Sequence, residues 1–392
     1  MDTTLLKCVR GAGFRLRAAF RVEQKHRPLR FRLMSIFRIF SMVPIMPIFI
    51  GNEKRLYVHG KPRPNSKTGN MFQELEAAGV QMDRVFVDQT KSPFIVIKLV
   101  RLLLRLPAVF VILFRIRHRR RTDVVDLTII LAREIVRQKL RGLPYLHPLI
   151  VSDLSPSMHI LWSAATAEGN RAIWWQDDFH HFKDIPYPLS AAAVLNLNGY
   201  LEVKKRSPNV KISLRKAQAP KPIPKIPLNP VLGVATNASF IGDLTQQQKI
   251  KSICKRLSAE TVWLRLHPNS SLAEAEFSGT GIKICSRLES MQEFSRRIDL
   301  CLVGNSASMI WILLNGIPVL HCCGLDDNEY DLYGYVESGF VLGECDLDTL
   351  SIAAINDFYS LNNERYEKFK DYVTNANVPE ERSLSDLAWI MK

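Results

Sequence analysis

Residues 299–321 decide the fold, and they read DLCLVGNSASMIWILLNGIPVLH. The run Asp299–Val303 is short and apolar, as a buried strand is, and Pro318–His321 has the same character. Between them, the apolar residues of 306–314 predict a helix, and Gly316 is suited to end it. A strand, a helix and a second strand in succession indicate a parallel sheet covered by helices.

The same alternation continues on both sides of this unit. On the C-terminal side we predict strands at 231–236, 261–266 and 282–285, helices at 246–257 and 290–297, and further helix beyond 347. On the N-terminal side we predict strands at 55–59, 84–88, 148–152, 171–176 and 193–197, and helices at 71–78 and 157–167. The pattern predicts an α/β protein with two Rossmann-like domains.

Residues 204–230 separate the two runs, because they hold eight basic residues and six prolines. This composition is unsuited to a helix or a central strand, so we predict a linker. The predicted order is a basic apolar segment (1–52), an N-terminal Rossmann-like domain (53–203), the linker (204–230) and a C-terminal Rossmann-like domain (231–392). Ligands of such sheets bind at the carboxyl ends of the strands, so we expect the site in a cleft between the domains.

The overall composition excludes several classes of protein. The chain has 392 residues, of which 47% are hydrophobic and 23% charged, values that argue against disorder, collagen and a multi-span membrane protein. The net charge of +15 is concentrated in residues 1–40 and 91–121, which carry +8 and +9. Both segments mix basic with large apolar residues, so we expect an anionic membrane surface as the partner and no nucleic acid.

The segment 94–121 is predicted to be a basic interfacial helix. Lys98, Arg101 and Arg105 fall on one helical face among apolar residues, and an arginine cluster follows at 115–121. Its longest charge-free run is too short to span a bilayer. The alternative is a buried helix whose arginines pair with acids elsewhere. Residues 33–51, with one charge and two prolines, are predicted to be a second membrane-contacting element.

Seven scattered cysteines without paired spacing favour a reducing compartment. The first residues do not have the pattern of a signal peptide. We therefore expect the protein in the cytoplasm or on its membrane.

The first candidate site follows the strand predicted at 171–176, where the sequence reads Asp177-Asp178-Phe179-His180-His181. Neighbouring carboxylates repel each other, which raises the pKa of one of them and suits it to take a proton from a sugar hydroxyl. The alternatives are a helix N-cap by Asp177 or Asp178 and, less favoured, a metal site. We predict no metal.

Two further candidates follow strands of the C-terminal half. His267 and Pro268 come after the strand 261–266, where the histidine could contact a nucleotide phosphate or be an ordinary loop residue. Gly304, Asn305, Ser306 and Ser308 come between the strand and the helix of the opening stretch. Amide groups and hydroxyls there suit a phosphate, although Asn305 or Ser306 could equally serve as a helix cap. The small-residue loop 233–243 could approach a ligand closely. The acidic residues Asp326, Asp327 and Glu329 are interpreted most simply as a solvated loop, with contact to a ribose as the alternative.

The order of an acidic pair, His-Pro and a serine motif over two such domains resembles bacterial GT-B glycosyltransferases of the sialyltransferase and polysialyltransferase type. Capsule Kdo transferases and teichoic-acid glycerophosphotransferases share the His-Pro and serine parts. The likeness covers about residues 145–345, with Phe179 where the motif has glycine and Ala307 between the two serines.

The resemblance implies that Asp177 or Asp178 is the base, that His267 with Pro268 serves the donor phosphate or leaving group, and that Ser306 and Ser308 bind phosphate. It implies an inverting, metal-independent enzyme without a cofactor. The donor would be a nucleotide sugar, with a CMP-sugar favoured. The acceptor would be a capsule, lipopolysaccharide or lipid-linked glycan at the cytoplasmic face of the inner membrane. One alternative is a CDP-alcohol phosphotransferase or UDP-sugar transferase of the same fold. Another is a non-catalytic protein that binds anionic lipid or nucleic acid.

Overall fold

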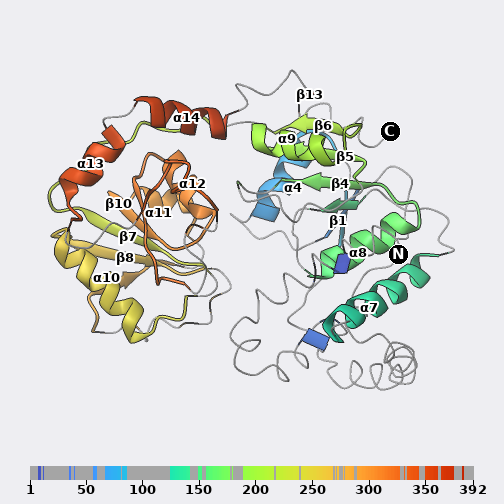
Figure 1. The fold of residues 1–392 in the computed structure, drawn as a ribbon, viewed down its shortest axis with the longest axis horizontal. Helices are drawn as coiled ribbons and strands as arrows, with labels where there is room; N and C mark the ends of the chain where they lie inside the picture. The colour runs from blue at the N-terminus through green and yellow to red at the C-terminus, as the bar shows by residue number, and fades with distance from the viewer. Residues whose placement is uncertain are drawn as a thin grey trace.

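A computed structural model of the chain contains two parallel β-sheets, each accompanied by helices (Figure 1). The residues that the structure describes are 8–9, 12, 35–36, 39, 56–59, 67–80, 82–85, 124–141, 149–151, 156–176, 179, 189–215, 218–237, 240–267, 270, 272, 277, 279–286, 289–326, 331, 333–343, 349–360, 363–374 and 382–383.

The first sheet has seven parallel strands in the order β13-β6-β5-β4-β3-β1-β2. The strands are β1 (Leu56–His59), β2 (Met82–Val85), β3 (Leu149–Val151), β4 (Ala172–Trp175), β5 (Ala191–Val194), β6 (Lys211–Leu214) and β13 (Arg382–Ser383). The helices of this half are α4 (Lys67–Ala77), α7 (Val124–Leu140), α8 (Pro156–Ala167) and α9 (Leu197–Arg206).

Strand β4 shows how this sheet is buried on both faces. Trp174 belongs to the core that contains α7 and α8, whereas Ile173 and Trp175 belong to the core that contains α4. Successive side chains of a strand point to opposite faces, so one apolar strand supplies two cores.

The second sheet has six parallel strands in the order β12-β11-β10-β7-β8-β9. Its strands are β7 (Val231–Ala235), β8 (Thr261–Arg265), β9 (Ile282–Ile284), β10 (Leu300–Val303), β11 (Val319–His321) and β12 (Leu342–Gly343). Its helices are α10 (Leu244–Arg256), α11 (Met291–Ser295), α12 (Ser308–Leu314), α13 (Ile352–Ser360) and α14 (Asn363–Val373).

All four residues of β10 are buried, and they divide between two cores in the same way as those of β4. Leu300 and Leu302 pack with α10, and Cys301 and Val303 pack with α11 and α12. The prediction of two Rossmann-like α/β domains is confirmed by these two parallel sheets.

The predicted linker, 204–230, begins too early, because its first residues belong to the first domain. Helix α9 continues to Arg206, and β6 forms at Lys211–Leu214 between β5 and β13. Pro208 precedes β6 and the other prolines follow it, so none removes a ladder hydrogen bond from the strand.

The predicted C-terminal domain, 231–392, also requires a correction. Strand β13 pairs in parallel with β6, with Arg382 opposite Ser213 and Ser383 opposite Leu214. The chain therefore returns to the first sheet after α14, as Figure 1 shows.

The segments predicted to contact a membrane are described only in part. The predicted interfacial helix at 94–121 lies outside the described residues. Within 1–52, the side chains of Cys8, Ala12 and Ile39 are fully buried and join the core formed by α7 and α8. Burial raises the pKa of the Cys8 thiol to about 12, despite a hydrogen bond with Ser163. These three positions therefore belong to the first domain's core.

Within the described residues, no helix combines the length and the apolar character that crossing a bilayer requires.

Candidate functional site

The turn between β10 and α12 carries four of the predicted site residues, Gly304, Asn305, Ser306 and Ser308. The hydroxyl of Ser308 donates to Oγ of Ser306 at 2.9 Å, and the amide of Ser308 donates to the same oxygen at 3.2 Å. Both serines are half-buried. Within the described part of the chain, the amide groups of Ser306 and Ala307 have no acceptor.

This turn can therefore offer donors to an anion. Two amide groups and the hydroxyl of Ser306 lie within two consecutive residues, and such N–H and O–H groups are the donors that phosphate oxygens accept from. The Ser308 hydroxyl lies beside them and donates to Ser306 Oγ. Helix α12 has only seven residues, and Ala307 at its N-cap makes no side-chain capping bond. The predicted capping role of Asn305 or Ser306 is thus reduced to the local bond between Ser306 and Ser308.

Beneath the turn, the carboxylate of Asp326 joins the loops that follow β7 and β10. Its Oδ2 accepts from the Asn305 amide at 2.5 Å and from Asn237 Nδ2 at 2.8 Å, and its Oδ1 accepts from Asn305 Nδ2 at 3.3 Å. Asn237 Nδ2 also donates to the Asn305 carbonyl at 3.1 Å. We call these three residues the Asp326 clamp.

The interpretation of Asp326 as part of a solvated loop is therefore wrong, because the residue is only 9% exposed. Asp327 lies outside the described residues. A side chain at Gly304 would place its Cβ 2.2 Å from Asp326 Oδ2, so this position has to be glycine for the carboxylate to sit there. His321, at the end of β11, is fully buried with its Nε2 3.4 Å from Asn305 Oδ1.

His267 lies at the same edge of the second sheet. Its amide donates to Thr236 Oγ1 at 3.1 Å, and the side chain of His267 is half-buried. Strand β7 lies between β8 and β10, so about 10 Å, two strand spacings, separates the loop of His267 from the serine turn. Thr236 and Asn237 occupy the space between them. Pro268 lies outside the described residues.

Asp177 and Asp178, one of which is the predicted base, lie outside the described residues. Phe179, which directly follows them, is among the described residues. Its side chain is 3% exposed and belongs to the core of the second domain. Its ring centroid is 5.4 Å from that of Trp311 on α12 and 6.0 Å from that of Tyr372 on α14. Phe179 is therefore an anchor between the domains.

Gln176, on the other side of the acidic pair, is fully buried and held by its own domain. Its Oε1 accepts from the Leu195 amide at 2.8 Å, and its Nε2 donates to Asn196 Oδ1 at 3.3 Å. Arg215 donates to its carbonyl oxygen, forms an ion pair with Glu74 and lies 4.6 Å from the ring centroid of Trp175. The carboxyl end of β4 is thus fixed by residues that directly follow β5 and β6, with Glu74 of α4 pairing with Arg215.

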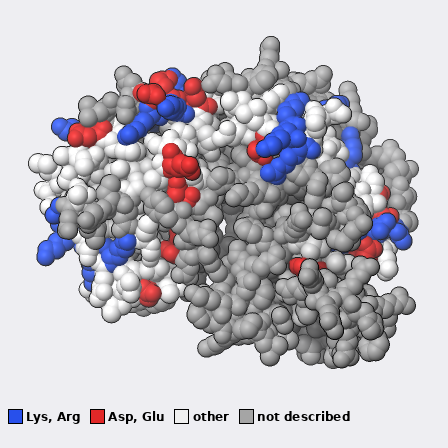
Figure 2. Space-filling model, in the orientation of Figure 1, with Lys and Arg blue, Asp and Glu red and all other residues white. Residues whose placement is uncertain are grey.

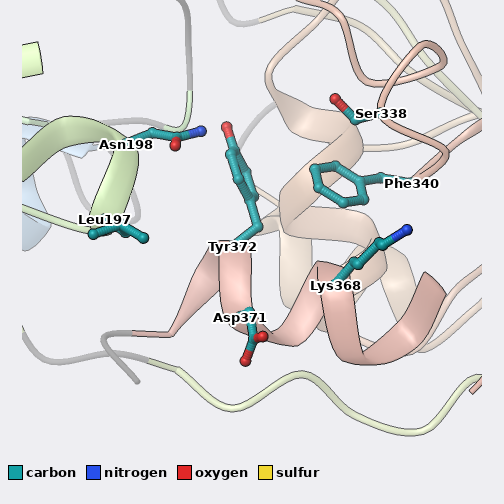
Figure 3. A pocket seen from close by; sticks show the side chains of 7 residues that line it. All are labelled: Leu197, Asn198, Ser338, Phe340, Lys368, Asp371 and Tyr372. Carbon is teal, nitrogen blue, oxygen red and sulfur yellow. The ribbon is translucent and has the colours of Figure 1, made fainter. Parts of the chain in front are cut away.

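A pocket of about 250 Å³ lies between α9 and α14 (Figure 3). Leu197 and Asn198 line it from the first domain, and Phe340, Lys368, Asp371 and Tyr372 line it from the second. It therefore marks the junction of the two domains beside Phe179.

Sequence reasoning did not single out His321, considered Thr236 and Asn237 only as part of the small-residue loop 233–243, and placed Asp326 in a solvated loop. Thr236 and Asn237 follow directly after the end of β7, so the rule that singled out His267 and the serine turn also points to them. The contacts of Asp326 and His321 with Asn305 join residues far apart in the chain and are found only from the structure.

Among the described residues, no three His, Cys, Asp or Glu side chains lie close enough together to hold a metal ion. On the face shown in Figure 2, basic and acidic side chains occur in small neighbouring groups, for example over α14, where Lys368 pairs with Glu364 at 2.7 Å. Helix α9 ends in Lys204, Lys205 and Arg206.

No protein-family model matches the sequence, and a search of curated proteins finds no relative. Among solved structures, MnaA of S. aureus, solved with UDP, has a TM-score of 0.47 at 10% identity, covering 82% of this chain and 92% of that one. The spinosyn rhamnosyltransferase SpnG has a TM-score of 0.45 at 10% identity, covering 86% and 99%. The glycosyltransferase SnogD from Streptomyces nogalater has 0.43 at 10%, covering 87% and 99%. With TM-scores below 0.5, these likenesses identify neither the family nor the substrate of this chain.

Proposed function

We propose that this chain is a glycosyltransferase that uses a nucleotide-activated sugar, and that the donor is a CMP-sugar. The observation that carries the proposal is the serine turn, where the amides of Ser306 and Ala307 and the hydroxyls of Ser306 and Ser308 lie at the carboxyl edge of the second sheet. His267 lies on the same edge, and Phe179 brings the chain that carries the acidic pair against α12.

In the proposed reaction, Asp177 or Asp178 takes the proton of an acceptor hydroxyl. The acceptor oxygen attacks the anomeric carbon of the donor, and the bond from that carbon to the phosphate oxygen breaks with its electron pair leaving on the nucleotide. Ser306, Ser308 and His267 stabilise the phosphate charge that develops. A single displacement of this kind inverts the configuration at the anomeric carbon. No metal is assigned to this step, so turnover in EDTA is expected to equal that in buffer.

Chain connectivity supports the assignment of the base. The ring of Phe179 contacts Trp311 on α12, the helix that follows the serine turn. Asp178 is the residue before Phe179 in the sequence, and consecutive Cα atoms are about 3.8 Å apart. The proposed base is therefore next in sequence to a residue at the boundary of the two domains.

The decisive experiment is a thermal-shift series with CMP, CDP, UDP, GDP and ADP. A ligand at a hundred times its dissociation constant stabilises a protein by about 2.7 kcal/mol, which raises the melting temperature by several degrees. We expect the largest shift with CMP, and its loss in Ser306→Ala together with Ser308→Ala. Ser252→Ala is the matched control, because the exposed hydroxyl of Ser252 donates to a carbonyl of its own helix, that of Gln248 in α10, at 2.9 Å.

Other outcomes of this series have distinct meanings. A preference for CDP or UDP would favour a CDP-alcohol phosphotransferase or a UDP-sugar transferase. The absence of a shift with every nucleotide would contradict the proposal and favour a non-catalytic binding protein.

We further propose that the enzyme works as a peripheral protein at the cytoplasmic face of the inner membrane, on a surface-glycan or glycolipid acceptor. The support is the combination of basic and apolar residues in 1–40 and 91–121.

A further inference from the structure

The pocket between α9 and α14 combines apolar walls with polar groups from both domains. Leu197, Phe340 and Tyr372 line it and are half-buried, whereas Asn198 and Asp371 line it and are exposed. In Figure 3, Tyr372 lies between the two residues of α9 on one side and Phe340 on the other. A molecule in this pocket would therefore contact carbon surface and hydrogen-bonding groups at the same time.

The walls of the pocket are held together across the domain boundary. Asn196, the N-cap of α9, accepts from the Gly199 amide at 3.0 Å, and its Nδ2 donates to the Tyr372 carbonyl at 3.0 Å. The ring centroid of Phe340 lies 4.9 Å from that of Tyr372 and 5.8 Å from that of buried Phe369. The pocket is thus formed in the free protein, so a ligand does not have to order its walls.

Side chains of both charges line the pocket, which disfavours a charged ligand. Lys368 would repel a cation, and Asp371 would repel an anion. Lys368 already pairs with Glu364 at 2.7 Å, whereas no ion pair joins Asp371 to another described residue. A neutral ligand is therefore favoured, and the Asp371 carboxylate is available to accept from its hydroxyl groups.

The remaining groups and the size of the pocket narrow the choice further. The amide of Asn198 both donates and accepts, and the Ser338 hydroxyl, which donates to the Gly334 carbonyl at 2.6 Å, keeps lone pairs that accept. The volume of about 250 Å³ is below the roughly 300–1,000 Å³ of pockets for drug-sized ligands. The pocket therefore suits one small ring better than a nucleotide.

We propose that this pocket is a binding site for one neutral sugar unit, separate from the serine turn. A sugar ring carries no charge, its hydroxyls donate and accept, and its C–H groups are attracted to the negative face of an aromatic ring such as that of Phe340. The site goes beyond the proposed function, because it requires neither the nucleotide donor nor the transfer step. The unit is either a free monosaccharide or one residue of a longer glycan.

The test measures the binding of glucose, galactose and N-acetylglucosamine by saturation-transfer NMR, with choline and CMP as charged comparisons. We expect at least one sugar to bind with a dissociation constant on the order of 1 mM, as suits a ligand of this size. CMP should not displace the sugar, because the proposed nucleotide site is the serine turn. Choline should bind more weakly than the sugar.

Two variants remove single contacts from the pocket. Asn198→Ala and Phe340→Leu should each raise the dissociation constant of the sugar about fivefold, through the loss of a hydrogen bond and of an aromatic face. Gln248→Ala is the control for the first, because Gln248 is an exposed amide on α10. Phe358→Leu is the control for the second, because Phe358 is half-buried on α13. If Phe340→Leu melts at a much lower temperature, the exposed position Asn198 decides the question.

Hydrogen–deuterium exchange locates the site independently. A saturating concentration of the sugar should slow exchange in the peptides that cover 197–206 and 363–373 together, because α9 and α14 both line the pocket. Slower exchange in only one of these helices would contradict a site shared by the two domains.

Longer saccharides separate the two sources of the sugar. Tighter binding of lactose, maltotriose or diacetylchitobiose than of the matching monosaccharide would support a residue of a glycan, and equal affinity would support a free sugar. The proposal would be overturned if no sugar binds, if the two pocket variants bind as wild type, or if choline binds more tightly than every sugar. Loss of nucleotide binding with sugar binding retained would contradict the proposed function alone.

Discussion

The Asp326 clamp is a buried carboxylate placed directly behind a turn that is proposed to bind an anion. Its charge does not oppose the anion strongly, because one of its oxygens accepts two N–H groups and the other accepts a third. The inward bond of the Asn305 amide leaves the next two amides, of Ser306 and Ala307, as the ones available to a ligand. The geometry of the turn therefore depends on a residue that need not touch the ligand.

Replacing Asp326 with asparagine is expected to loosen this turn. The new amide group would face the donors of Asn305 and Asn237, and a buried donor without an acceptor costs about 1–3 kcal/mol. We expect the free energy of unfolding to fall by that amount in urea titrations, and nucleotide affinity to fall about tenfold. Asp243→Asn is the control, because Asp243 caps α10 and asparagine caps equally well. Equal behaviour of the two variants would argue against the clamp.

At the residue scale, the sequence predicts the position of a residue where the signal is local. Ser306 and Ser308 lie within five residues of the end of β10, and the structure places their hydroxyl oxygens 2.9 Å apart. Their role in binding phosphate stays a prediction. The partner of Asn237 is Asp326, which is 89 positions away. No spacing rule connects two such residues, because only the folded sheet brings their loops into contact.

At the scale of elements, α12 is fixed at its end by the linker. The amide of Lys221 donates to the Leu314 carbonyl at 3.0 Å, and Gly316 follows the helix with φ at +80°. A Cβ at Gly316 would lie 2.7 Å from the Pro222 carbonyl oxygen. The glycine thus serves both the backbone turn and the close approach of the linker.

Gly316→Ala and Gly279→Ala separate these two requirements. Both glycines have positive φ, but nothing lies within 4 Å of a Cβ built at Gly279. Each alanine should cost about 1–2 kcal/mol for the left-handed backbone, and Gly316→Ala should cost about 1–3 kcal/mol more for the clash with the linker. Equal melting temperatures for the two variants would contradict the packing of the linker against α12.

Helices and strands differ in how well the sequence predicts them. The residues by which α7 joins the core shared with α8 fall at 125, 129, 132, 136 and 140, a helical spacing that the sequence carries even though α7 is absent from the elements predicted above. Strand β6 is different, because its four residues lie between Pro208 and a proline-rich stretch at 220–230 and include buried Ser213. Its place in the sheet is set by β5 and β13, so local composition predicts a linker there.

At the scale of the whole molecule, the distribution of charge predicts which segment binds a membrane. Replacing Lys98, Arg101 and Arg105 with glutamate changes the charge of the most basic segment by −6, two units for each of the three residues. We expect the variant to be released from vesicles that contain anionic lipid, and wild-type binding to weaken as salt shortens the Debye length. Nucleotide affinity should change much less with salt. Undiminished vesicle binding of the variant would contradict the membrane proposal.

The return of the chain to the first sheet has a consequence for biosynthesis. Ser213 of β6 is translated about 170 residues before Arg382, its partner in β13. During synthesis the edge of β6 therefore stays without its partner β13 until the second domain has emerged from the ribosome. Folding of the first half is then completed last, although domains generally fold in the order of synthesis. An exposed strand edge invites non-native pairing, so a chaperone that shields nascent β6 would raise the yield of this protein.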